Sequence, residues 1–214
     1  YLRSLLSGDR VSCRAVIEET LKNGIPAHCV YTDLVWPIMV EIDRLHREGC
    51  IDSAREAFAS RINRTIINQL QNKLPRRGIK GKKVVVCTAD NEQSEVGGQM
   101  IADLFESDGW ETRFLGGTVC QDDILAFIHE YRPEILLLYG MNGSDAPGVR
   151  RLIDRIRGIN AFPEMQIMLS GGVFARAEGL WEEIGADLYA LNPAEAVNIA
   201  NLDRETLPSP TRTI

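Results

Sequence analysis

Apolar residues recur at helical spacing from Asp9 to Leu74. Asp9 is a residue type that is favoured at a helix N-cap, and the first helix is expected to end at Asn23-Gly24. A second helical run is expected from about Ala27 to Glu48-Gly49, with one face formed by Val35, Met39, Ile42 and His46.

A third helix is predicted after Asp52, which can serve as its N-cap. Its apolar residues recur at every fourth position, and they are Ala54, Phe58, Ile62, Ile66 and Leu70. The N-terminal part of the chain is therefore predicted to be a small helical bundle.

The hydrophobic period changes after a basic segment that is rich in helix breakers. Short β-branched or unbroken apolar runs then alternate with helical patterns. The strands are expected at 83–89, 111–115, 135–139, 165–170 and 188–190. The helices are expected at 95–107, 122–131, 146–159, 177–184 and 193–201.

This alternation predicts a flavodoxin-like (Rossmann-like) doubly wound parallel five-stranded sheet, so the fold class is α + α/β. The continuous apolar run at 135–138 suits a parallel strand that helices cover on both faces. The predicted organisation is a helical bundle at 1–75, a linker at 76–82, the α/β domain at 83–202 and a C-terminal tail at 203–214, in which 207–210 is expected to be disordered.

Composition narrows the functional classes. The net charge is −6 with acids and bases interspersed, so this segment is not expected to bind nucleic acid directly. The five cysteines form no Cys-x-x-Cys pair, which argues against a disulfide framework or a zinc site and favours a reducing compartment. No apolar run approaches the roughly 18 residues of a membrane span. We therefore expect a cytoplasmic protein that does not bind a membrane.

The ligand crevice of a doubly wound sheet lies at the carboxyl ends of its strands. Glycine and polar residues gather there, at 90–97, 116–117, 140–144 and 171–172. No Ser-His-Asp set, paired-carboxylate site or Walker loop is visible, which argues against an enzyme.

A helical bundle followed by this order of glycine-rich strand ends resembles the cobalamin-binding modules of methionine synthase, corrinoid proteins and light- or cofactor-sensing transcription regulators. The resemblance covers nearly the whole chain, and its clearest motif is Gly171-Gly172-Val173. It implies a cobalamin whose nucleotide tail threads between the strand ends, past Gly171 and Gly172, where the lack of side chains leaves room.

Two other motifs of that family are altered here. The family's Asp-x-His-x-x-Gly loop reads Glu92-Gln93-Ser94-Glu95-Val96-Gly97, with Ser94 in place of the cobalt-ligating histidine. A neutral hydroxyl is a poor cobalt ligand. The family's Ser-x-Leu reads Tyr139-Gly140-Met141, which places a bulky side chain beside the expected tail.

On the bundle side, the resemblance points to a Trp-x9-Glu-His signature that caps the upper face of the corrin. Here the glutamate is kept as Glu56, while His46 replaces the tryptophan and Ala57 the final histidine. Since neutral imidazole binds cobalt and iron, His46 is a candidate axial metal ligand.

Each candidate also has a purely structural interpretation. His46 would lie in the last turn of a helix, where the macrodipole favours it. Ser94 could be the N-cap of a helix that starts at Glu95, and Gly171-Gly172 could form only a tight turn.

The leading hypothesis is a regulatory sensor that binds cobalamin, haem or another tetrapyrrole between bundle and sheet. It would signal to a partner such as a transcription regulator or a fused signalling domain, and a homo-oligomer is compatible with this role. The second hypothesis is a cofactor-free antirepressor or scaffold that has lost the ligand. A corrinoid shuttle for methyl transfer ranks last because the histidine is missing.

Overall fold

The computed structural model describes residues 1–89 and 92–202 and divides the chain into two compact units, Tyr1–Arg76 and Arg77–Ile214. Asp90, Asn91 and the predicted tail 203–214 lie outside the described residues. Because the units are separate bodies, each is described by itself.

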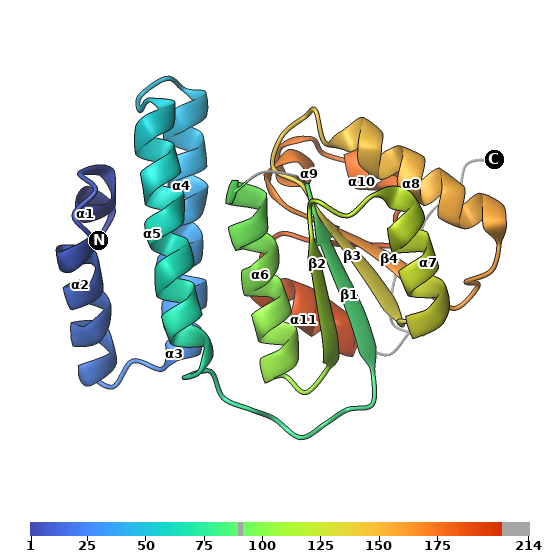
Figure 1. Ribbon diagram of the computed structural model, residues 1–214, viewed down its shortest axis with the longest axis horizontal. Coiled ribbons are helices and arrows are strands. Elements are labelled where there is room, and N and C mark those ends of the chain that lie inside the picture. The colour runs from blue at the N-terminus through green and yellow to red at the C-terminus, as the bar shows by residue number, and fades with distance from the viewer. Residues whose placement is uncertain (90–91, 203–214) are drawn as a thin grey trace. The chain divides into compact units, whose positions relative to one another are not determined.

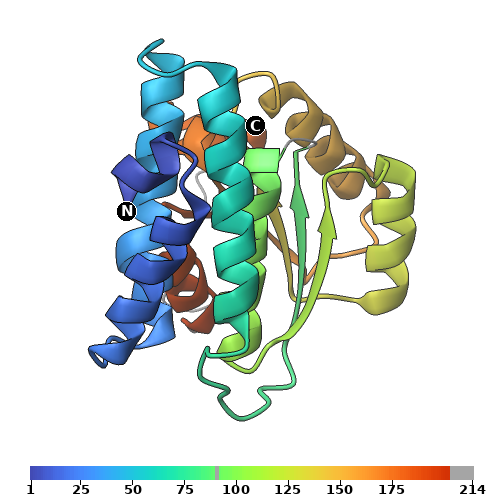
Figure 2. The same cartoon turned by 60° about the vertical axis from the view of Figure 1, so that its left-hand side comes forward.

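The first unit is all-helical. Within it, α2, α4 and α5 run side by side (Figure 2). Its elements are α1 (Leu2–Leu6), α2 (Arg10–Lys22), α3 (Ala27–Cys29), the π-helix η1 (Val30–Val35), α4 (Trp36–Arg47) and α5 (Ser53–Gln71). The predicted helical bundle is confirmed.

The predicted N-caps hold two of these helices. The Asp9 carboxylate accepts hydrogen bonds from the amides of Val11 and Ser12, at 3.1 and 3.0 Å. The Asp52 carboxylate accepts one from the Arg55 amide at 2.8 Å. These bonds satisfy amides that have no partner inside the helix and so fix where α2 and α5 begin.

The second helical run differs from the prediction of one continuous helix, because η1 separates α3 from α4. Pro37 lies in the first turn of α4 and has no amide hydrogen to donate to the preceding turn. A wider π turn before it accommodates that missing bond. On α5, Ile62, Ile66 and Leu70 are buried as predicted, whereas Ala54 is exposed.

The second unit is a five-stranded parallel sheet in the order β2-β1-β3-β4-β5. Its strands are β1 (Lys83–Thr88), β2 (Glu111–Gly116), β3 (Ile135–Tyr139), β4 (Gln166–Ser170) and β5 (Leu188–Ala190). Its helices are α6 (Glu92–Ser107), α7 (Gln121–Tyr131), α8 (Ala146–Ile159), α9 (Gly172–Arg176), α10 (Leu180–Ile184) and α11 (Pro193–Asn201).

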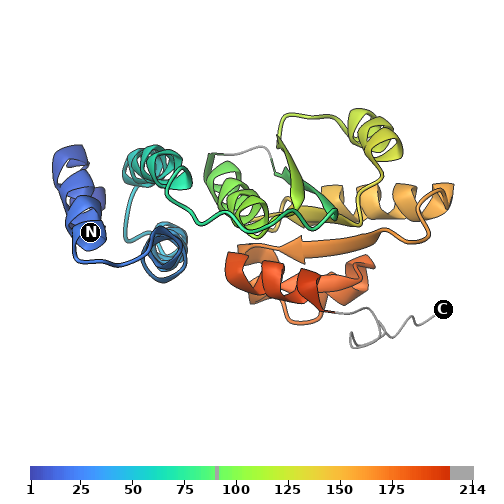
Figure 3. The same cartoon turned by 90° about the horizontal axis from the view of Figure 1, so that it is seen from below.

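Helices cover both faces of this sheet (Figures 1 and 3). Helices α6 and α11 lie on one face, and α7 and α8 lie on the other. Every residue of β3 is buried, as expected for a central parallel strand. The strand order reverses between β1 and β3, so these two strands form the topological switch point. The predicted fold class is confirmed.

Two helix starts in this unit differ from the prediction. Helix α6 begins at Glu92, so Ser94 lies inside its first turn and is not an N-cap. The predicted helix 177–184 is replaced by α9 and α10, which meet around Gly179 at a φ of +77°. Gly171 has a φ of +110°, which lets the chain turn from β4 directly into α9.

The segment that follows Arg76 is bonded to the amino-terminal edge of the sheet. Asp108, at the end of α6, accepts hydrogen bonds from Arg77 and Lys80 at 2.7 and 2.5 Å and from the Asn201 amide at 2.7 Å. Burial alone would raise the pKa of Asp108, but these donors and the positive charge of Lys80 hold it below its ordinary value. This network ties the entry of the α/β unit to α6 and α11.

Candidate cofactor-binding site

The carboxyl ends of β1 and β3 bring together most of the predicted site residues of the α/β unit. Side chains alternate along a strand, so Thr88 and Tyr139 face α6, while Cys87 and Leu138 face α7 and α8. The edge therefore has two sides, which are called here the α6 side and the α7/α8 side.

On the α6 side, Tyr139 is packed against Gly97. A methyl group built on Gly97 would lie 2.4 Å from Tyr139 Cζ, closer than real contacts allow. Tyr139 is 3% exposed, and its hydroxyl donates a hydrogen bond to Met141 Sδ at 3.0 Å. The side chains of Tyr139 and Met141 are called here the Tyr139–Met141 plug.

The Tyr139–Met141 plug contacts both α6, at Gly97, and α9, at Gly172. Met141 is 4% exposed, and its sulfur also accepts a hydrogen bond from the Gly172 amide at 3.5 Å. A methyl group on Gly172 would lie 3.3 Å from the Met141 methyl and 2.5 Å from Arg176 Nη1. The space beside Gly97 and Gly172 is thus filled by side chains of the chain itself.

Gly171 has a backbone reason to be glycine. A methyl group there would lie 2.1 Å from the carbonyl oxygen of Gly140. The neighbouring amides bind the same loop, since Gly140 donates to the Ser170 carbonyl at 3.1 Å and Val173 donates to the Gly140 carbonyl at 3.4 Å. The Gly171-Gly172 pair therefore serves close backbone packing between the ends of β3 and β4.

Helix α6 is also tied to the end of β2. The Glu95 carboxylate accepts a hydrogen bond from the Gly117 amide at 2.7 Å and lies 3.4 Å from the Thr88 hydroxyl. Ser94, one residue earlier, is fully buried. Glu92 and Gln93 are the first residues of α6, and their side chains lie outside the described part of the structure.

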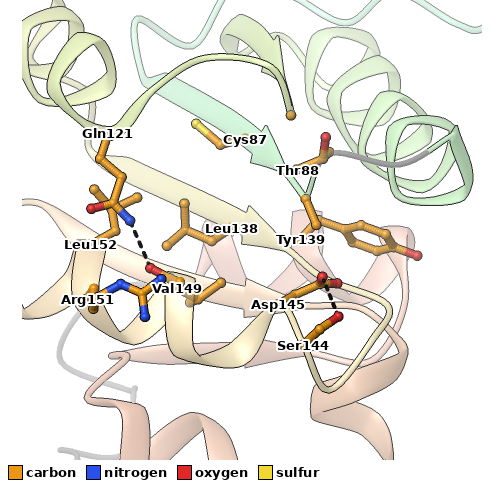
Figure 4. Close-up of a pocket in the computed structure, with 13 residues that line it drawn as sticks. Cys87, Thr88, Gln121, Leu138, Tyr139, Ser144, Asp145, Val149, Arg151 and Leu152 are labelled. Atoms are coloured by element: carbon orange, nitrogen blue, oxygen red, sulfur yellow. Dashed lines mark hydrogen bonds between the residues drawn. The ribbon is translucent and has the colours of Figure 1, made fainter.

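On the α7/α8 side, the strand ends border a cavity of about 270 Å³ (Figure 4). Gln121, from the start of α7, donates a hydrogen bond across it to the Gly148 carbonyl at 3.1 Å. The Tyr139 ring points away from Gln121 and Arg151 in this view. Small-molecule sites usually measure about 300–1,000 Å³, so this cavity suits a small group and not a whole macrocycle.

Hydrogen bonds fix the loop that borders this cavity. The Asp145 carboxylate accepts from the amides of Met141 and Asn142, at 3.0 and 2.9 Å. Arg176 donates to the Met141 carbonyl at 2.5 Å from the other direction. The loop after β3 is therefore held at both ends, which also fixes the position of the plug.

The described residues of this edge form no ready-made metal site. Cys87 is 3% exposed, and burial raises the pKa of its thiol to about 12, so it stays protonated at neutral pH and is a weak ligand. Within the described ranges, no cluster of three or more His, Cys, Asp or Glu side chains could hold a metal ion. The same residues include no helix that is long and apolar enough to cross a membrane.

The helical unit carries the remaining two predicted residues. His46 lies in the last turn of α4 and is half-buried, with Nε2 3.2 Å from the Ser53 hydroxyl. Glu56 is in the first turn of α5, where it accepts a hydrogen bond from Ser60 at 3.1 Å. The bundle therefore brings the two side chains close to the same end of α5.

A doubly wound sheet with glycine-rich loops at its switch point defines a ligand-binding α/β module, here following a helical unit. The chain belongs to the B12 binding domain family. The profile of that family matches residues 82–200, and a second profile, also described as a B12 binding domain, matches residues 1–71. The predicted family is confirmed, and cobalamin is the cofactor that defines it.

Relatives with known roles match along most of the chain. A monomethylamine corrinoid protein 2 of Methanosarcina acetivorans is 22% identical over 203 residues, which cover 92% of each chain. A dimethylamine corrinoid protein 3 of Methanosarcina mazei is 25% identical over 137 residues, which cover 63% of this chain and 80% of that protein.

Solved structures share the fold. A monomethylamine corrinoid protein of Methanosarcina barkeri superposes with a TM-score of 0.83 at 18% identity, covering 93% of this chain and 94% of that one. A chain of the methanol:cobalamin methyltransferase complex of the same organism gives a TM-score of 0.51 at 16% identity, covering 94% of this chain and 76% of that one.

These comparisons correct the leading functional hypothesis. The relatives are corrinoid proteins of methylamine systems, so the prediction of a regulatory sensor with a transcription regulator as partner is wrong. The error arose because the replacement of the cobalt-ligating histidine by Ser94 was taken to exclude a methyl-carrying role. The similarity instead extends across both units of the chain, and the hypothesis that ranked last is the one the relatives favour.

The described residues do not fit a cobalamin whose nucleotide tail is inserted between the strand ends. A tail threaded between the strand ends needs room beside Gly97, Gly171 and Gly172, and that room is occupied by the Tyr139–Met141 plug, the Gly140 carbonyl and Arg176. Ser94 offers no imidazole to a metal below the ring. Binding with an inserted tail and a cobalt-ligating histidine at position 94 therefore does not fit this arrangement.

Several residues that shape this edge were not predicted. Glu95, Asp145 and Arg176 act through bonds to loop amides or carbonyls. Such bonds depend on where three loops meet, which no local pattern indicates. Arg151 and Gln121 border the cavity only because α7 and α8 begin beside each other. The one usable signal was that both helices start next to predicted strand ends.

Proposed function

We propose that this chain carries a corrinoid for a methyltransferase system and catalyses no reaction by itself. The observation that supports this role is the mutual coverage of 92% with a monomethylamine corrinoid protein, which spans both units. The family match supplies the cofactor class. The methyl donor could be a methylamine, as in the names of the relatives, or another small methylated compound.

In this role the protein binds the corrinoid and presents it to a partner enzyme, while the corrinoid, when bound, supplies the methyl-carrying chemistry. The α/β unit suits such presentation because its strand-end loops are fixed by Asp145, Arg176 and Glu95. A rigid edge holds a bound group in one orientation and lowers the entropic cost of binding.

The test is a two-stage assay with the full chain. The protein is incubated with aquacobalamin and passed through a desalting column, and the absorbance of the protein fraction is recorded. The loaded protein is then reduced to the cob(I) state with titanium(III) citrate, because only that state accepts a methyl cation, and is mixed with a monomethylamine or dimethylamine methyltransferase and a labelled substrate. We expect retained pigment and label transferred to the corrinoid protein, while retained pigment without transfer from any methylated donor would contradict the carrier role.

His46 is proposed as a metal ligand or ring contact contributed by the helical unit, since neutral imidazole coordinates cobalt. The absorbance spectrum of the loaded wild-type protein is compared with that of His46→Ala and, as a control at an exposed site on the same helix, Arg44→Ala. We expect a shifted spectrum only for His46→Ala. Identical spectra for all three proteins would remove His46 from the site.

A further inference from the structure

We infer that the α/β unit binds a corrinoid with the nucleotide tail outside the protein, so that it selects its cofactor by the ring and not by the tail. This inference rests on the proposed corrinoid-carrying function. It assigns to Tyr139 the role of a specificity-determining residue, since its side chain closes the space that a tail would need.

The first support is the packing between α6 and the sheet. Gly97 and Gly98 lie so close to the strands that methyl groups on them would meet Tyr139 Cζ at 2.4 Å and Thr88 Cγ2 at 2.1 Å. Glycine at these positions is therefore needed to admit the chain's own side chains. The backbone of α6 and the side chains of Thr88 and Tyr139 are therefore in direct contact at these two glycines.

The second support is that hydrogen bonds fix both residues of the Tyr139–Met141 plug. The Tyr139 hydroxyl bonds to Met141 Sδ, and the Gly172 amide bonds to the same sulfur. Arg176 holds the Met141 carbonyl, and Asp145 holds the Met141 amide. Removing the ring from its site would break the hydroxyl–sulfur bond and leave a void beside Gly97.

The third support is the contrast with the other side of the same strand ends. The α7/α8 side keeps an opening of about 270 Å³ that Gln121, Ser144 and Asp145 border and that Thr88 and Tyr139 also line. The fold therefore does not close this edge everywhere. The Tyr139 ring fills the part of the edge beside Gly97, where the proposed function would otherwise place the base of an inserted tail.

The experiment compares aquacobalamin with diaquacobinamide, which has the same ring and metal but no nucleotide tail. Dissociation constants for the full chain are measured by equilibrium dialysis with absorbance detection. We expect the two constants to agree within about twofold, because a tail outside the protein adds few contacts. Two variants, Tyr139→Ser and Tyr139→Phe, are measured alongside.

The variants separate a filled channel from a general loss of structure. Tyr139→Ser removes the ring and should make cobalamin bind at least about tenfold tighter than cobinamide. Tyr139→Phe keeps the ring against Gly97 and should keep the wild-type ratio. If Tyr139→Ser does not fold, the ratio of the two wild-type dissociation constants alone decides whether the tail lies outside the protein.

The outcomes are distinct for the inference and for the proposed function. A wild-type protein that binds cobalamin more than about tenfold tighter than cobinamide would show that the tail is inserted, which overturns the inference and leaves the carrier role standing. A protein that retains neither corrinoid would overturn the carrier role and the inference with it.

Discussion

The two sides of the sheet's carboxyl edge are built from alternate residues of the same two strands, yet they differ in what they leave open. On the α6 side, Thr88 and Tyr139 meet Gly98 and Gly97 without spare volume. On the α7/α8 side, Cys87 and Leu138 line a cavity of about 270 Å³, which Thr88 and Tyr139 also border. Fold alone therefore does not determine whether a switch point is open, since one bulky side chain at a strand end can fill it.

The largest effect is expected for Gly171→Ala, at the close backbone contact between the ends of β3 and β4. The added methyl group would lie 2.1 Å from the Gly140 carbonyl, at a φ of +110° that side chains rarely adopt. We expect the free energy of unfolding to fall by about 4 kcal/mol, from strain and overpacking together. Urea denaturation followed by circular dichroism measures it.

A control for that variant is Gly179→Ala, which has a φ of +77° in the milder left-handed helical region and has nothing within 4 Å of the added methyl group. It should cost only about 1 kcal/mol, the strain contribution alone. Equal losses for the two variants would show that the contact with the Gly140 carbonyl is unimportant.

A double-mutant cycle tests the packing between Gly97 and Tyr139. Gly97→Ala alone should lower the free energy of unfolding by about 3 kcal/mol, because the new methyl group meets the ring at 2.4 Å. In a Tyr139→Ser background the same substitution should cost little, since the ring is gone. Additive losses would mean that Tyr139 does not fill the space beside Gly97.

The amino-terminal edge of the sheet is held by ion pairs, so its contribution to stability should depend on pH, unlike the packing at Gly97. Asp108→Asn should lower the free energy of unfolding by about 2 kcal/mol at pH 7, because the buried carboxylate binds Lys80 and Arg77. The pKa of Asp108 is held below its unfolded value, so this stabilisation is present above about pH 4 and is lost as the pH falls through the folded pKa.

The measurement is the difference in unfolding free energy between wild type and Asp108→Asn at several pH values. We expect it to shrink below about pH 4. The Gly97→Ala loss involves no titrating group and should stay constant over the same range. A difference for Asp108→Asn that is also independent of pH would contradict the assigned ion pairs.

The smallest effect on stability is expected on the α7/α8 side. Gly148 lies in the first turns of α8, and a methyl group there would have the Arg151 side chain as its nearest neighbour, at 3.8 Å. Gly148→Ala should therefore stabilise the protein by about 0.5 kcal/mol, since alanine loses less conformational freedom in a helix. A clear loss of stability, seen as a lower melting temperature, would mean that this side is as tightly packed as the other.

Most of the fold follows from local patterns. The change from helical to strand periodicity after Leu74 agrees with the change from helices to strands in the element order, and the strand predicted at 135–139 has the bounds of β3. Asp9 and Asp52 act as the predicted caps because capping uses only the first helical turn. The short α1 and the π-helix η1 were not predicted, since their formation depends on tertiary packing and on Pro37.

The site was only partly predictable, for a physical reason. That Tyr139 is too large for its expected role is visible in the sequence, but its contact with Gly97 requires the distance between α6 and β3. The predicted space beside Gly171 is taken up by the Gly140 carbonyl, which no side-chain pattern reveals. Weighing the missing histidine at position 94 above the whole-chain architecture produced the wrong function.

The most direct measurement is a crystal structure of the full chain loaded with cobalamin. We expect the Tyr139 ring to stay against Gly97, with its hydroxyl bonded to Met141 Sδ, and the nucleotide tail to lie outside the α/β unit. Density for the tail beside Gly97 and Gly172, with the Tyr139 side chain rotated away, would contradict this inference.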